Sequence, residues 1–322
     1  MNAGDFKSFV AEVRSLSIRQ RTKLFELLKG ESQYQKTVEL IEQSASSTLS
    51  CPRCRSSHYH LHGHAHGLQR YRCTHCGRTY NALTGTPMAW LRYKDRWLDF
   101  ADCMLNSYTV RRAASRCDIH KSTSFRWRHR FLAVSKTDRP QCLHGITEAD
   151  EMYLLESEKG ARHLDRPARK RGGSAKQRGT SHEQVCVLVA RDRTGQTLDF
   201  ITGKGPVSKA QLKRCLMPVI DKEVLLVSDS NASYRYFALD NGISHRAINL
   251  RAGVRVIGAI HIQNVNAYHS RFRGWLERFH GVATVYLQNY LAWRWIIDAK
   301  RITHPEPLLR AAIGDFPHFS RT

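Results

Sequence analysis

The sequence predicts a mixed α/β domain over residues 141–322, preceded by a small cysteine-bearing module and helical regions. From about residue 142 onward, short apolar runs alternate with stretches of helical periodicity, as in domains that pack helices on a sheet. Upstream, two Cys-x-x-Cys pairs stand in a basic stretch with few candidate helices or strands. A length of 322 residues fits two or three domains of about 100–200 residues each.

The chain divides into four predicted regions. They are a helical N-terminal region with a linker at 1–50, the cysteine module at 51–85, a second helical region at 86–140 and the α/β domain at 141–322. Apolar residues between positions 6 and 28 recur at helical spacing and predict two short helices divided near Ser17. A short helix at 37–42 and the polar run SASSTLS, typical of a linker, complete the first region.

The α/β domain contains five predicted strands and four predicted helices. The strands are 146–155, 185–190, 197–201, 224–228 and 244–248. The helices are 208–220, 232–239, 265–279 and 287–299. Residues 159–178 are so dense in Lys, Arg and Gly that we expect a mobile loop there.

The charge of the chain predicts a polyanionic partner. The formal net charge is +23 with a pI near 10.0, and the basic residues are spread along the sequence. No apolar run reaches the roughly 20 residues of a spanning helix, and the first residues lack the apolar core of a signal peptide. We therefore expect a nucleic-acid-binding protein of the cytoplasm, associated with the nucleoid and not with a membrane.

The two cysteine pairs predict a structural zinc site. Cys51, Cys54, Cys73 and Cys76 have the spacing of a four-thiolate site, with eighteen residues between the pairs. Four thiolates fill a tetrahedron and leave no position for water, so the zinc would be structural rather than catalytic. Redox chemistry or coincidence is the alternative, and we interpret the five histidines between residues 58 and 66 as loop surface. This module is predicted to be a zinc ribbon.

Two short helices follow the cysteine module, at 108–117 and 121–133, and predict a helix-turn-helix. Ser122 is placed to cap the second helix. The basic residues of the second helix offer contacts to DNA bases or phosphates; they are Lys121, Arg126, Arg128 and Arg130. A solvated basic helix packed on the ribbon is the alternative.

Asp150 and Asp229 are the candidate metal-binding carboxylates. Asp150 lies inside a predicted strand and Asp229 ends another. An acid at such a position is costly to bury unless it is paired or binds a metal. For Asp229 taken alone, the cap of a turn or helix is an equally good interpretation.

Three segments give these residues a family context: EADEMY at 148–153, VSDSNASY at 227–234 and HIQNVNAYHSRFR at 261–273. With the preceding cysteine and helical modules, they resemble the ISXO-like insertion-sequence transposases over nearly the whole chain. The resemblance implies a ribonuclease-H-like fold, Mg²⁺ or Mn²⁺ as cofactor, and Asp150 and Asp229 as two ligands. The third acidic position of the family is Asn266 here, whose amide oxygen can serve as a neutral ligand.

Helix and strand geometry distinguishes the residues near the third ligand position. Arg273 lies seven residues beyond Asn266, on the same helical face about 10 Å along, within reach of a phosphate. Glu277 would lie about 16 Å along, too far to share the metals. On the strand of Asp150, alternation points Glu148 to the same face and Glu151 away, so Glu148 is the reserve ligand.

The resemblance implies an enzyme that binds the inverted repeats at the ends of its element, cleaves double-stranded DNA and joins its 3′ ends to target DNA. We expect a homo-oligomer on DNA, with phosphate contacts from the basic loop through Arg169, Lys170 and Arg171. Two alternatives are open. One is a DNA-binding protein with an inert catalytic domain, and the other is a nuclease of similar fold that cuts without joining.

Overall fold

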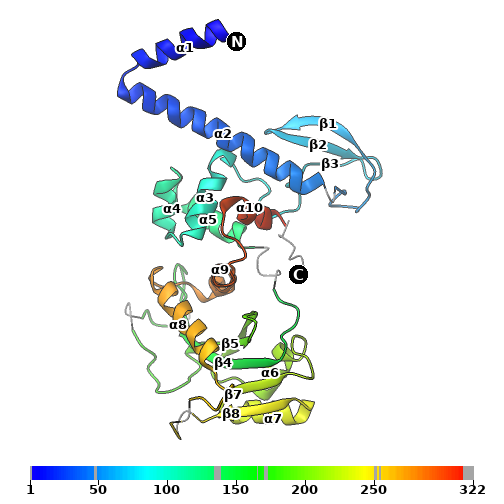
Figure 1. Cartoon of the computed structure of the whole chain (residues 1–322), viewed down its shortest axis with the longest axis vertical. Helices are drawn as coiled ribbons and strands as arrows, with labels where there is room; N and C mark the ends of the chain where they lie inside the picture. The colour runs from blue at the N-terminus through cyan, green and yellow to red at the C-terminus, as the bar shows by residue number, and fades with distance from the viewer. Residues whose placement is uncertain are drawn as a thin grey trace. The chain divides into compact units, whose positions relative to one another are not determined.

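The computed structural model describes residues 2–46, 49–133, 139–164, 166–169, 173–249, 252–253 and 255–314. The chain divides into two compact units, which we call unit 1, Met1–Val134 with Ile302–Thr322, and unit 2, Ser135–Arg301 (Figure 1). Within the described residues, none of the helices has the length and hydropathy needed to cross a membrane.

Unit 1 contains helices and a small sheet. Its helices are α1 (Ala3–Ser15), α2 (Ile18–Ser46), α3 (Trp97–Leu105), α4 (Val110–Arg116), α5 (Lys121–Phe131) and α10 (Pro305–Ile313), with a 3-10 turn η1 (Lys94–Arg96). The predicted helix break near Ser17 is confirmed. The expected separate helix at 37–42 is wrong, because α2 continues through Gly30. Its C-terminal part buries Leu40 and Ile41, and this packing outweighs the low helix propensity of one glycine.

The sheet of unit 1 is antiparallel, in the order β1 (Tyr59–Ala65), β2 (Leu68–Cys73), β3 (Thr79–Tyr80). His66 and Gly67 form the two-residue turn between β1 and β2, both with positive φ, as such hairpin turns require. The His66 carbonyl accepts hydrogen bonds from the Tyr34 hydroxyl (2.8 Å) and the Lys94 ammonium (3.2 Å). These bonds dock the hairpin on α2 and η1.

The remaining helices of unit 1 share an aromatic core. Trp127 of α5 packs edge-on against Phe100 of α3, with ring centroids 5.3 Å apart. Helix α10 packs on α2, α3 and α5, although it follows unit 2 in the sequence. It was not predicted, yet Pro305 at its first turn and Gly314 at its C-cap are ordinary signals of where a helix begins and ends.

Unit 2 is built on a five-stranded mixed sheet. The strands are β4 (Ile146–Leu155), β5 (Gln184–Asp192), β6 (Thr197–Lys204), β7 (Leu225–Asp229) and β8 (Ser244–Ile248), in the order β6-β5-β4-β7-β8. The first three form an antiparallel meander, whereas β7 pairs parallel to β4 and β8 parallel to β7. All five predicted strands are confirmed.

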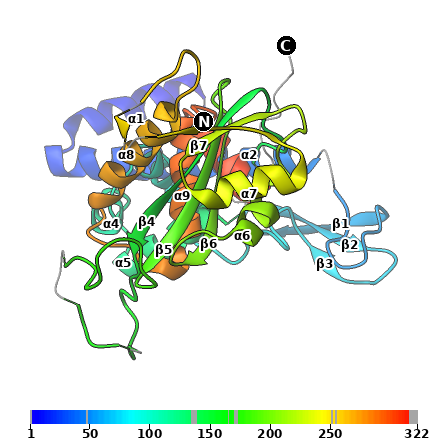
Figure 2. The same ribbon diagram turned by 90° about the horizontal axis from the view of Figure 1, so that it is seen from below.

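Helices cover both faces of this sheet. They are α6 (Lys209–Leu216), α7 (Ala232–Asn241), α8 (Gln263–Glu277) and α9 (Leu287–Asp298), as predicted. Ala149 of β4 belongs to one core with Leu212 of α6 and Tyr234 of α7. Its neighbour Glu148 points to the opposite face and contacts α8. Figure 2 shows α8 on one side of the strands and α6 and α7 on the other. The predicted mixed α/β class is confirmed.

Candidate active site

Asp150 and Asp229 lie at matching positions on neighbouring parallel strands. Glu148 of β4 pairs with Val227 of β7, and two residues farther along both strands lie Asp150 and Asp229. An even step keeps both aspartates on the sheet face that Glu148 occupies, which is the face covered by α8. The structure therefore brings the two predicted carboxylates together.

One face of α8 completes the surroundings of these carboxylates. Asn266 and Arg273 are both exposed on this helix, and they line one cavity of about 390 Å³ together with Asp150. The lining residues are Asp150, Glu151, Asn266, His269, Ser270, Arg273, Gly274 and Glu277. The predicted shared face of Asn266 and Arg273 is confirmed. Glu277, set aside by its distance along the helix, also lines this cavity.

Burial and like charge act on the carboxylates. Burial and the nearby charge of Asp229 together raise the pKa of Asp150 to about 6, although the Arg273 guanidinium opposes the shift. Burial likewise raises the pKa of Glu151 to about 7. Carboxylates that disfavour one another's ionised form in a partly buried site are suited to a bound cation, which restores their charged state.

Glu151 was expected to point away from this site, and strand alternation does direct it to the other sheet face. There it accepts a hydrogen bond from the hydroxyl of Tyr234, a buried residue of α7. It nevertheless lines the cavity. Strand β7 ends at Asp229, and the pairing of β4 with β7 covers Ile146–Glu148, so Glu151 lies beyond the paired part of β4 on that side.

His269 is a cavity residue that the sequence analysis missed. It is buried on α8 with its Nδ1 3.8 Å from Oδ2 of Asp150. Burial and the Arg273 charge lower its pKa to about 3, so its imidazole is neutral at physiological pH. Its position three residues after Asn266, on the same helical face, was the available signal.

Glu148 cannot serve as the reserve ligand that we expected. Its Oε2 accepts from the backbone N–H of Val265 (3.0 Å) and its Oε1 from the side-chain amide of Asn264 (2.9 Å), while Arg193 and His261 contact the same carboxylate. The carboxylate is fully buried. It caps the first turn of α8, whose N-cap residue supplies no side-chain hydrogen bond. Its role is therefore structural.

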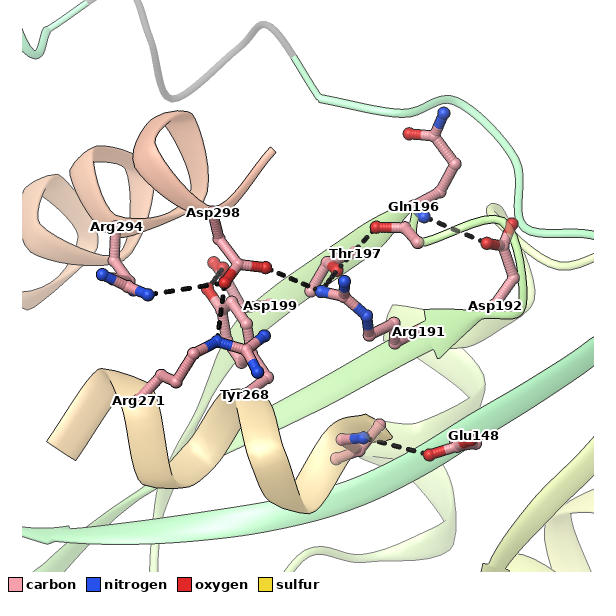
Figure 3. A network of polar contacts seen from close by, with 12 residues as sticks. Glu148, Arg191, Asp192, Gln196, Thr197, Asp199, Tyr268, Arg271, Arg294 and Asp298 are labelled. Carbon is pink, nitrogen blue, oxygen red and sulfur yellow. Dashed lines mark hydrogen bonds and ion pairs between the residues drawn. The ribbon is translucent and has the colours of Figure 1, made fainter. Parts of the chain in front are cut away.

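A second polar network fixes the middle of α8 (Figure 3). Tyr268 donates its hydroxyl to Asp199 of β6 (3.1 Å). Arg271 donates to Asp298 of α9 (2.8 Å), which also accepts from Arg191 of β5 (2.9 Å). Together with Glu148, these contacts hold the helix that carries Asn266 and Arg273 at a set position over the sheet.

The four predicted metal-binding cysteines form a cluster in unit 1. Their sulfur atoms all lie within 4.8 Å of one another, with 3.6 Å between Cys51 and Cys76 and 3.5 Å between Cys54 and Cys73. A backbone hydrogen bond from Cys54 lowers the pKa of Cys51 to about 6, and one from Cys76 lowers the pKa of Cys73. Both effects favour the thiolate, the form that binds metals. A backbone hydrogen bond from Ser56 lowers the pKa of Cys54, but burial and the neighbouring sulfurs outweigh it and raise that pKa to about 12, and burial also raises the pKa of Cys76. The cluster can hold a metal ion.

Helices α4 and α5 confirm the predicted helix pair and correct two of its details. His120 caps α5 in place of Ser122, since its Nδ1 accepts from the Ser122 N–H (3.3 Å). Arg128 was expected to contact DNA, but it is 1% exposed and donates to the Tyr108 carbonyl (2.6 Å). It joins α5 to the start of α4 and is not presented to a ligand. Lys121, Arg126 and Arg130 are exposed.

The basic loop of unit 2 is only partly described. Lys170 and Arg171 lie outside the described residues. Arg169 donates to the backbone carbonyl of Glu156 (2.6 Å). Lys159 donates to three carbonyls after α8, those of residues 279–281, at 2.8–3.3 Å. Lys159 and Arg169, which belong to the loop predicted to bind phosphates, therefore also make hydrogen bonds within the protein.

Comparison with known proteins shows that unit 2 is similar to transposases. Residues 142–295 match the family model of the ISXO2-like transposase domain, and this match confirms the resemblance to ISXO-like transposases. The chain is also 28% identical over 244 residues to an uncharacterised protein in transposable element ISH50 of Halobacterium salinarum. That match covers 75% of this chain and 82% of the relative.

The similar solved structures include Mos1 transposase complexes. A pre-cleavage Mos1 transpososome is 14% identical, covers 68% of this chain and 79% of its own, and has a TM-score of 0.26. A Mos1 paired-end complex with the left transposon end is 14% identical, covers 67% and 79%, and has a TM-score of 0.19. These TM-scores are too low to define the fold of this chain.

Proposed function

We propose that the chain is an active transposase that binds the terminal repeats of its insertion sequence through unit 1 and cleaves and joins DNA through unit 2. One observation carries the catalytic part of this proposal. Asp150 and Asp229 lie at matching positions on the neighbouring parallel strands β4 and β7, and Asp150 lines a cavity that Asn266 and Arg273 line from α8. The transposase family of residues 142–295 supports the same conclusion.

The sheet of unit 2 supports the ribonuclease-H-like fold that the resemblance implies. A three-stranded antiparallel meander whose first strand, β4, pairs in parallel with β7, which in turn pairs with β8, matches that fold. In unit 1 we assign residues 51–85 to a zinc ribbon and residues 86–140 to the helix-turn-helix region, within which α4 and α5 are the helix pair. We assign residues 141–322 to the ribonuclease-H-like domain, whose sheet lies in unit 2.

The donor set of the cavity fits Mg²⁺ or Mn²⁺, which prefer oxygen ligands. Asp150 and Asp229 would hold the ions with charged oxygens and Asn266 with a neutral amide oxygen. When bound, such ions activate the attacking hydroxyl or water and stabilise the leaving 3′-oxygen. Arg273 lies on the same helical face and would bind a phosphate of the DNA strand. His269, being neutral, adds no positive charge beside the ion-binding carboxylates.

The cysteine cluster fits Zn²⁺. Sulfurs 2.3 Å from a tetrahedral ion lie about 3.8 Å apart, close to the 3.5 and 3.6 Å between the paired cysteines. We assign the ion a structural role, because the core around it contains few other buried side chains.

DNA binding is assigned to the exposed basic residues of α5 and to the basic loop. Lys121, Arg126 and Arg130 remain candidates for end recognition, and Arg169, Lys170 and Arg171 for phosphate contacts. Target DNA would enter the same catalytic cavity once a 3′ end is free, and we propose a homo-oligomer on DNA that brings two ends together.

The test uses the full chain and duplex DNA from the two flanks of its gene, with a random duplex of equal length as control. We expect Mg²⁺- or Mn²⁺-dependent 3′-hydroxyl ends and joined products on gels, both reduced at least about 100-fold by Asp150→Ala. Binding of the flanking DNA with no cleavage in either metal would mean an inert DNA-binding protein. Cleavage without joined products would mean a nuclease.

A further inference from the structure

Among the described residues, one tryptophan of unit 1 is almost fully exposed. Trp90 is 99% exposed, whereas the other five tryptophans are buried, with exposed fractions of 0–4%. An indole is a large apolar surface, and leaving it in water forgoes about 1.5–3 kcal/mol of burial free energy. Tyr93, three residues on, is 58% exposed. We name residues 86–93, which carry both rings, the wedge loop.

The wedge loop is strained and held firmly. Trp90 has φ 64° and Tyr93 φ 60°, left-handed conformations that large side chains rarely adopt. The buried Met88 anchors the loop in the core of unit 1. The Trp97 indole donates to the Arg92 carbonyl (3.1 Å), and Arg130 donates to the Pro87 carbonyl (3.0 Å). The exposed rings therefore project from a fixed backbone.

The charges around the wedge loop favour a polyanion as its partner. Arg92, between the two rings, is exposed. Arg130 touches the loop from α5, and Arg126, one helical turn earlier on the same face, is exposed as well. The acid nearest in sequence, Asp95, is paired with Arg96. Aromatic rings flanked by cations on a rigid loop are the means by which proteins stack on bases while binding the backbone.

We propose that the wedge loop is a second DNA contact of unit 1, in which Trp90 stacks on bases of the duplex beside the groove that α5 enters. Arg92 and Arg130 would hold the phosphates on either side. The inference rests on the proposed function, because it requires DNA on α5. It goes further because it assigns a contact whose strength depends on base stacking and on how easily the duplex deforms. This contact does not depend on hydrogen bonds to the edges of the bases.

Trp90 can be observed on its own, because it is the exposed tryptophan among six. Acrylamide, a neutral quencher, should quench its emission in the free protein and leave the buried five largely unaffected. Adding duplex DNA from the flank of the gene should then quench part of the Trp90 emission and protect the rest of the Trp90 emission from acrylamide. A Trp90→Phe variant, which lacks this fluorophore, should show neither change.

Binding measured against salt separates stacking from charge. Trp90→Ala should weaken duplex binding by about tenfold or more, with an unchanged slope of log K against log salt, since no phosphate contact is lost. Arg92→Ala, which removes an exposed cation of the wedge loop, should reduce that slope. Trp90→Phe should retain most of the affinity, and Leu239→Ala, which removes an exposed apolar side chain of unit 2, should change nothing.

The strain gives a readout that needs no DNA. Trp90→Gly relieves the left-handed conformation without removing any packing, so the free protein should unfold at a higher urea concentration while its DNA affinity falls. A merely tolerated exposed residue would not show this opposition.

The outcomes keep the two proposals apart. If the chain binds no duplex, the proposed function fails first. If it binds while Trp90 stays equally open to acrylamide and Trp90→Ala binds as tightly as the parent, the wedge contact is wrong. If Trp90 becomes protected as protein concentration rises without DNA, and Trp90→Ala abolishes self-association, its partner is a second copy and the DNA contact is refuted.

Discussion

Glu148 and Asp150 lie two residues apart on one strand and have different tasks. Both face α8, but the two carboxylate oxygens of Glu148 accept hydrogen bonds from the first turn of that helix and from Arg193. Asp150 keeps a cavity in front of it. Alternation along the strand correctly predicted their common face. It could not show that one carboxylate was already engaged, because the partners come from residues more than forty positions away.

The first prediction concerns Glu148. Glu148→Ala should lower the free energy of unfolding of unit 2 by about 3–5 kcal/mol, because it removes a fully buried carboxylate that pairs with Arg193 and accepts from the Val265 N–H. Urea unfolding followed by the fluorescence of the unit 2 tryptophans measures this. The matched control is Glu223→Ala, at an exposed site, where we expect a change within about 0.5 kcal/mol. Equal effects of the two substitutions would contradict the capping role.

The second prediction separates two arginines of α5. Arg126 is exposed, so Arg126→Ala should reduce the preference for flanking over random DNA and leave stability within about 0.5 kcal/mol. Arg128 is buried against the Tyr108 carbonyl, so Arg128→Ala should lower the unfolding free energy of unit 1 by about 2 kcal/mol or more. The Arg128→Ala protein that remains folded should prefer flanking over random DNA as strongly as the parent protein does. Competition binding and urea titrations read the two effects, and a reversed pattern would exclude this assignment.

At the scale of elements, periodicity predicted the strands of unit 2 and the helices that cover them, because each has one face in a core. Arg128 shows the limit. Ser124, Trp127 and Phe131 mark the buried face of α5, and Arg128 lies within that stripe. The spacing was visible in the sequence, but composition alone suggested a DNA contact. Helix α10 was missed because its partners α2, α3 and α5 lie in unit 1, far earlier along the chain and on the other side of unit 2 in the sequence.

The third prediction concerns the β1-β2 hairpin, whose second strand ends at Cys73. A methyl group at Gly67 would lie 2.2 Å from the Tyr34 hydroxyl, whereas one at Gly63 would meet nothing within 4 Å, and both glycines have positive φ. Gly63→Ala should cost about 1–2 kcal/mol of left-handed strain. Gly67→Ala should cost at least about 1 kcal/mol more, because Tyr34 must release the His66 carbonyl. Thermal unfolding of unit 1 tests the difference, and equal losses would mean that the hairpin does not dock on α2.

At the scale of the whole molecule, the two compact units imply two unfolding transitions. The fourth prediction is that the purified protein contains one zinc ion and that a chelator unfolds the ribbon of unit 1 while the sheet of unit 2 stays intact. Cys73→Ser should reproduce this loss. Cys142→Ser, at a cysteine outside the cluster, should not. Zinc analysis and circular dichroism provide the measurements, and zinc-free protein with an intact unit 1 would refute the ribbon.

The resemblance of the motifs supplied what physical patterns in the sequence could not. Alternation and strand ends marked Asp150 and Asp229 as unusual acids, but only the family pattern joined them to Asn266, more than a hundred residues from Asp150 along the chain. The structure places Asp150 and Asn266 in one cavity with His269 and Glu151, and it places Asp229 beside Asp150 on the neighbouring strand. The positions of His269 and Glu151 depend on how α8 crosses the sheet and where β7 stops, which are properties of the assembled unit.

The proposed metal site depends on Asn266 as its third ligand, and metal-dependent cleavage of flanking DNA by Asn266→Ala, beside Asp150→Ala and Asp229→Ala, tests this most directly. The exposed position of Asn266 means that its removal should leave the urea midpoint unchanged. We predict that all three variants lose cleavage by at least about 100-fold, whereas Asn266→Asp keeps metal binding. If Asn266→Ala cleaves as fast as the parent, Asn266 is no ligand, and Glu151, which already lines the cavity, would take its place in the site.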